Sequence, residues 1–165
     1  MREVPGVRVR RLYLPVVMAV AVAGCATKVF LGDESPALNN PDDPFVCPAG
    51  AEKRVAARTF RELNKELFGE DFSERGEGFI APQMVAPPKL TYPGGLFGRK
   101  PGFVALVVIV SPAGSFRDPK VVCSTGLDFE KVATASIATA VVRPATQDGV
   151  PVESAVLIPV KFELR

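Results

Sequence analysis

The sequence predicts an α+β domain, namely a three-stranded antiparallel sheet with a packed helix, preceded by an extra N-terminal amphipathic helix. Three patterns support this class: an apolar run at residues 103–110, a helix-period pattern at 125–142, and alternating apolar residues at 156–164. With a second strand at 116–123, the order along the chain is β-β-α-β. A strand that is apolar on both faces belongs inside a sheet, whereas strands that contain proline belong at edges. We therefore expect the sheet order 2-1-3, with residues 103–110 in the centre.

The N-terminal residues have the pattern of an export signal. Arg8, Arg10 and Arg11 precede an apolar run that is shorter than the roughly 20 residues needed to span a membrane. Small residues and Cys25 follow, and the whole stretch resembles a bacterial lipoprotein signal. The resemblance implies cleavage after residue 24 and attachment of lipid, such as palmitate, to Cys25. Because the next residue is Ala26 and not aspartate, the sorting rule of this family implies delivery to the periplasmic side of the outer membrane.

Removal of the signal peptide, residues 1–24, changes the charge of the chain. This segment holds four arginines and one glutamate, so the formal charge falls from +2 to −1. The basic balance therefore belongs to the export signal, and it indicates no nucleic-acid partner.

The cysteines predict one disulfide. The chain has three, and lipidation of Cys25 leaves Cys47 and Cys123. The bacterial envelope is oxidising, so we expect these two to be bridged. Two separate buried thiols remain the alternative, because a sequence does not show whether two sulfurs meet.

Three segments are expected between the anchor and the C-terminal domain. Residues 25–51 are polar and rich in turn formers, and we interpret them as a lipid-anchored tether. Residues 52–69 predict an amphipathic helix that ends at Gly69, which either packs on the sheet or binds a partner. Its apolar face consists of Ala56, Phe60, Leu63 and Leu67. Residues 70–87 are a linker rich in proline and glycine, and residues 88–165 form the domain.

The elements of this domain carry local signals as well. Thr125 and Asp128 match a capping box, which predicts a helix that begins at residue 125 and ends before Pro144. Pro119 and Pro159 lie inside the second and last strands, where they indicate edges or bulges.

Residues from about 88 to 164 resemble a TonB C-terminal domain. The resemblance rests on the order and spacing of five short pieces, at residues 89–93, 102–104, 114, 143–152 and 156–164. The single positions that match the family pattern are Tyr92, Pro93, Arg143, Pro144, Ala145 and Gly149. Two features depart from the family: residues 93–98 are rich in glycine where relatives have helical turns, and the aromatic residue near the end of the central helix is missing. The resemblance implies a three-stranded antiparallel sheet with helices.

Catalytic chemistry finds little support in the sequence. The chain has no histidine, which excludes Ser-His-Asp and Cys-His arrangements and removes the commonest metal ligand. It has no Cys-x-x-Cys motif and no glycine-rich phosphate loop after a strand. We therefore expect no enzymatic activity, no cofactor and no metal site.

Binding through the backbone is the remaining possibility. The resemblance implies that the last strand accepts an extended peptide from an outer-membrane receptor, by adding a strand to an open sheet edge. The residues of this edge are Val156, Leu157, Ile158, Pro159, Val160, Lys161 and Phe162. In the alternative interpretation, Pro159, Lys161 and Glu163 merely protect the edge against aggregation. Two open edges would also permit a strand-paired homodimer.

Two functions are therefore open. The first is a lipid-anchored envelope module that docks extended segments of membrane partners, such as an outer-membrane receptor or another envelope protein. The alternative is a TonB-type energy transducer for transmembrane transport of siderophore-like cargo across the outer membrane. We favour the binding module, because a lipid inserts only acyl chains into one leaflet and does not engage a motor through a spanning helix.

Overall fold

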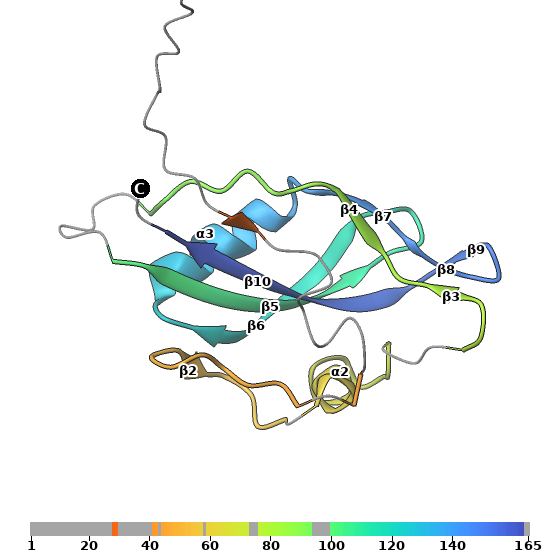
Figure 1. Cartoon of the computed structure of the whole chain (residues 1–165), viewed down its shortest axis with the longest axis horizontal. Helices are drawn as coiled ribbons and strands as arrows, with labels where there is room; N and C mark the ends of the chain where they lie inside the picture. The colour runs from red at the N-terminus through yellow and green to blue at the C-terminus, as the bar shows by residue number, and fades with distance from the viewer. Residues whose placement is uncertain are drawn as a thin grey trace, which may run out of the picture.

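A computed structural model describes residues 28–29, 41–42, 44–57, 59–72, 76–93 and 100–163 (Figure 1). The predicted signal peptide, Cys25 and most of the predicted tether lie outside the described residues. No helix within the described ranges has both the length and the apolar character needed to cross a membrane.

The main sheet has five antiparallel strands in the order β1-β10-β5-β6-β2. Its long strands are β5 (Gly102–Val110), β6 (Phe116–Ser124) and β10 (Ser154–Phe162), and two-residue strands β1 (Lys28–Val29) and β2 (Glu52–Lys53) flank them. The predicted three-stranded sheet is therefore wrong. β1 and β2 come from segments that the sequence assigned to the tether and to a helix, and both join the sheet by pairing with residues at least 70 positions away.

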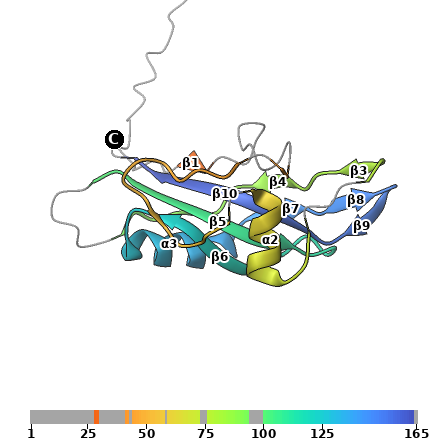
Figure 2. The same cartoon turned by 90° about the horizontal axis from the view of Figure 1, so that it is seen from below.

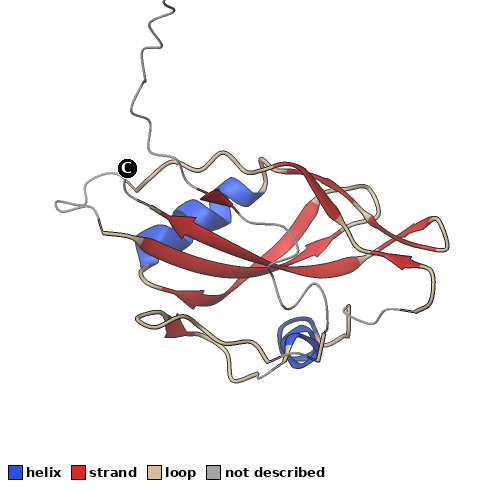
Figure 3. Ribbon diagram, viewed as in Figure 1, coloured by secondary structure: helices blue, strands red, loops and turns tan. Residues whose placement is uncertain are grey.

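Two small sheets extend the fold beyond the long strands (Figure 3). One joins β3 (Phe79–Ile80), β8 (Ala145–Gln147) and β9 (Val150–Val152), and the other joins β4 (Gln83–Ala86) to β7 (Val141–Arg143). The predicted linker at 70–87 thus contributes two strands. Because these strands find their partners 55 or more residues along the chain, local composition does not reveal them.

Helix α3 (Leu127–Ile137) is shorter than the predicted helix at 125–142. The capping box predicted at Thr125 is wrong, since Gly126 is the N-cap and no side chain caps the helix. The Thr125 hydroxyl instead accepts a hydrogen bond from the backbone N–H of Phe103 at 2.8 Å. At the other end the chain leaves the helix to form β7.

Helix α2 (Phe60–Phe68) begins eight residues later than the predicted start at residue 52. A reciprocal capping box starts it: the Glu62 N–H donates to the Thr59 hydroxyl at 3.1 Å, and the Thr59 N–H donates to the Glu62 carboxylate at 2.8 Å. It ends at Gly69 in the left-handed conformation (φ 76°), which confirms the predicted stop. At the start of the predicted helix, Glu52 and Lys53 form β2 instead.

Strand β5 lies at the centre of two hydrophobic clusters, one on each face of the sheet. Its residues Val104, Leu106, Val108 and Val110 pack in the cluster that contains the α3 side chains. Ala105 and Val107 pack in the cluster that contains the α2 side chains. In Figure 1, α2 lies below the long strands, whereas α3 overlaps β10 in the view. The interior position predicted for residues 103–110 is confirmed.

The second cluster explains why the N-terminal helix is present. Phe60 and Leu63 of α2 are completely buried, and burying each contributes about 1.5–3 kcal/mol. Of the predicted apolar face, Leu67 also packs against this cluster, whereas Ala56 is exposed and precedes the helix. The helix therefore covers a sheet face that would otherwise meet water.

Candidate functional site: the outer edge of the last strand

The outer edge of β10 is the side of this strand that faces away from β5. Successive residues of an antiparallel strand direct their backbone N–H and C=O groups alternately to the two sides. The Ala155 N–H donates to the carbonyl of Phe72 at 3.3 Å, away from β5. By this alternation, Leu157, Pro159 and Lys161 also direct their backbone groups outward.

Pro159 lies in β10 without breaking the main ladder. It is the register partner of Ala105 on β5, and its missing N–H belongs to the outward side. The proline therefore removes no hydrogen bond between the two central strands. Its presence does not mean that β10 ends the sheet, because β1 lies beyond it.

The outer edge is occupied at both ends. Near the end of β10, Lys28 pairs with Lys161 and Val29 pairs with Val160. Near its start, Phe72 accepts the hydrogen bond from Ala155. Figure 2 shows β1 beside β10. The fully open edge expected over residues 156–162 is therefore reduced: within the described parts of the chain, residues 156–159 have no strand partner on the outer side.

Most side chains of the predicted edge are buried rather than available to a partner. Val156, Ile158, Val160 and Phe162 belong to the α3 cluster, and Leu157 belongs to the α2 cluster. Pro159 is half-buried and Lys161 is exposed. What this edge offers on its outer side is therefore backbone: the N–H and C=O of Leu157 and the C=O of Pro159.

Tyr92 stabilises the end of β10. Its ring lies edge-on to Phe129 of α3 and Phe162 of β10, with centroid distances of 5.9 and 6.3 Å. Its hydroxyl donates to the backbone carbonyl of Lys100 at 2.5 Å. Pro93, the next residue, is buried. These two positions of the family pattern thus join the segment before β5 to the end of the edge strand.

The remaining positions of the family pattern lie in the small sheets. Arg143 donates to the side chain of Gln83 at 3.1 Å, which links β7 to β4. Ala145 is completely buried and Pro144 is half-buried. Gly149 turns the chain between β8 and β9 with a φ of 82°. None of these residues belongs to β10, and we interpret them as structural.

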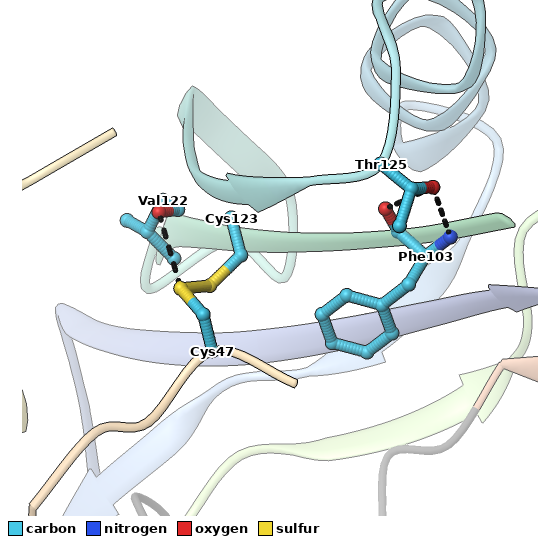
Figure 4. The surroundings of a disulfide bond; sticks show 5 residues. All are labelled: Cys47, Phe103, Val122, Cys123 and Thr125. Carbon is cyan, nitrogen blue, oxygen red and sulfur yellow. Dashed lines mark hydrogen bonds between the residues drawn. A yellow bond between two sulfur atoms is a disulfide. The ribbon is translucent and has the colours of Figure 1, made fainter. Parts of the chain in front are cut away.

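Cys47 and Cys123 form a disulfide, with their Cα atoms 5.9 Å apart (Figure 4). The pairing expected from the oxidising compartment is confirmed. Cys123 is completely buried in β6, and Cys47 packs against the α2 cluster. The bond attaches the segment before α2 to the sheet.

Two arginines hold the N-terminal segments by charge. Arg61 of α2 donates to Asp42 at 2.8 Å and to Asp71 at 2.5 Å, and these hydrogen bonds raise its pKa. Arg54 donates to Glu130 of α3 at 2.9 Å, and that hydrogen bond and charge raise its pKa. All of these groups already have partners of opposite charge. Across the described residues, no three histidine, cysteine or acidic side chains gather in a way that could hold a metal.

Sequence reasoning missed the residues that limit the edge, Lys28–Val29 and Phe72. A signal for the first was present, because Val29, Phe30 and Leu31 form a short apolar run inside a polar segment. No sequence pattern indicated that the Phe72 carbonyl meets β10, since this contact joins residues far apart in the chain.

Comparison with protein families finds a match in the C-terminal part of the chain. Residues 98–164 match the family described as Gram-negative bacterial TonB protein C-terminal. The matched region begins before β5 and ends after β10, so it contains the complete candidate edge. No curated protein and no solved structure matches the chain.

Proposed function

Because residues 98–164 match the TonB C-terminal domain family, we propose that this chain is a lipid-anchored binding module of the bacterial envelope. In this proposal, the domain docks an extended segment of a membrane protein along the outer edge of β10. The observation that carries the proposal is the stretch 156–159, which directs backbone groups outward and has no strand partner among the described residues. An extended peptide satisfies such groups by adding a strand.

The composition of the edge supports recognition of backbone more than of side chains. Four of its seven side chains are buried against α3, and Leu157 is buried on the other face. A docked segment would gain hydrogen bonds from Leu157 and Pro159 and meet only Pro159 and Lys161 as accessible side chains. Because backbone hydrogen bonds do not depend on residue type, we expect modest sequence selectivity from the edge itself.

Crosslinking inside cells tests the docking. A photoreactive amino acid at Lys161 should capture a membrane protein, because this exposed position lies on the docking edge. The matched control is the same group at Val150, which is 64% exposed but lies on β9 in another sheet. Capture at neither position in a folded chain, or of the same protein at both, would count against the proposal.

Lipid labelling tests the anchor separately. The change Cys25→Ala should abolish incorporation of radiolabelled palmitate, because the acyl chains are proposed to be attached at this residue. Cys47→Ala is the matched control and should label like the unchanged chain. Persistent labelling of the Cys25→Ala variant would show that the anchor proposal is wrong.

A further inference from the structure

Strand β1 lies on the edge to which we assign partner docking. Its register with β10 is antiparallel, with Lys28 opposite Lys161 and Val29 opposite Val160. Lys161 directs its backbone groups outward, so the Lys28–Lys161 pair is the one that exchanges hydrogen bonds. The chain thus supplies its own occupant for one end of the docking edge.

This occupant is held by a short ladder. β1 pairs through two residues, whereas β10 pairs with β5 through nine. The described ladder stops at Val160, immediately before Pro159, which has no N–H to offer the next position. Each net backbone hydrogen bond shifts such an equilibrium only about fivefold, so a two-residue strand is easily displaced.

A longer segment would bind the edge better than β1. It could make the same hydrogen bonds to Lys161 and continue past Pro159, using the carbonyl of that residue and both backbone groups of Leu157. Without displacing β1, a docked strand is confined to residues 156–159, between Val29 and the Phe72 contact.

We propose that β1 is an intramolecular placeholder that a docked segment must displace, an inference that rests on the proposed function of the β10 edge.

Amide hydrogen exchange on the full chain in detergent micelles tests the placeholder. The change Lys28→Pro removes the N–H that faces β10, and it should speed exchange of the Lys161 amide about fivefold. Val29→Pro is the matched control, because the Val29 N–H faces away from β10 and its loss should leave Lys161 protected. Both substitutions change one residue of the two-residue strand β1 and none of β5, β6 or β10, so the fold should persist in each.

A synthetic peptide with the sequence of residues 26–33 provides a second measurement. The peptide should bind the Lys28→Pro chain up to about fivefold more tightly than the unchanged chain, because β1 of the variant competes less for the edge. Equal Lys161 exchange rates and equal peptide affinities in the Lys28→Pro chain and the unchanged chain would overturn the inference. Failure of the Lys161 crosslink alone would instead overturn partner docking, because neither of these measurements requires an external partner.

Discussion

Gly114, in the turn between β5 and β6, combines a left-handed backbone conformation with a close approach of another backbone segment. It has a φ of 77°, and a Cβ there would lie 2.6 Å from the carbonyl oxygen of Val142. Gly149 has a similar φ of 82°, but a Cβ there would meet no atom within 4 Å. Alanine substitutions at the two positions therefore separate the cost of the left-handed backbone from the cost of the contact with Val142.

We predict that Gly114→Ala lowers the free energy of unfolding by about 2–4 kcal/mol, because left-handed strain and a backbone clash add. Gly149→Ala should cost about 1–2 kcal/mol from strain alone. Urea denaturation followed by circular dichroism measures both. Equal losses would show that the turn at Gly114 moves away from Val142 without penalty.

The charge of Arg61 does not respond to pH near neutrality. Hydrogen bonds to Asp42 and Asp71 raise its pKa in the folded state. A raised pKa contributes stability that is complete below the unfolded value and is lost only as the pH rises through the folded value. Arg61 therefore stays charged and contributes to the attachment of α2 over the whole physiological pH range.

Two similar patterns show how far single residues could be interpreted from sequence. Thr125 with Asp128 and Thr59 with Glu62 both match a capping box, and only the second forms one. The Thr125 hydroxyl bonds Phe103 instead, 22 residues away in the chain. Local spacing therefore predicts which groups could cap a helix, whereas a tertiary partner decides which of them does.

At the level of elements, the cap of α2 can be tested directly. Thr59→Ala should lower the free energy of unfolding by about 1 kcal/mol, because the Glu62 N–H loses its acceptor. Thr59→Ser is the matched control and should keep most of the stability, since it retains the hydroxyl. Thermal unfolding of the three chains provides the comparison, and an equal loss in both variants would contradict a capping role.

The elements that sequence predicted well are those whose pattern is local. The apolar run at 103–110 and the alternation at 156–164 correspond to β5 and β10. A buried strand can be recognised locally, because its own residues are apolar. β1, β2 and β4 were missed, because each is short and gains its order from a distant partner. The strand that carries the candidate edge was therefore predicted from sequence, but what occupies the ends of that edge was not.

For the whole molecule, the disulfide is the clearest determinant of stability. Removing it should lower the free energy of unfolding by about 2–5 kcal/mol, because Cys47 and Cys123 close a long loop. Cys47→Ala, Cys123→Ala and the double variant should lose nearly the same amount, since each removes the same bond. Chemical denaturation under oxidising conditions measures all three. Losses that add in the double variant would show that the two cysteines contribute independently.

The disulfide also determines how mechanical load would travel through the molecule. A pull on the proposed N-terminal anchor would first meet hydrogen-bonded contacts, those of β1 with β10 and of Pro41 with Arg61, and would then cross to β6 through the covalent Cys47–Cys123 bond. From β6 it would pass through β5 to β10, all nine residues of which have partners on β5. Helix α2 also takes load, through the contacts of Arg61 with Pro41 and Asp42, and the covalent bond limits how far such a pull could move this cover of the second sheet face.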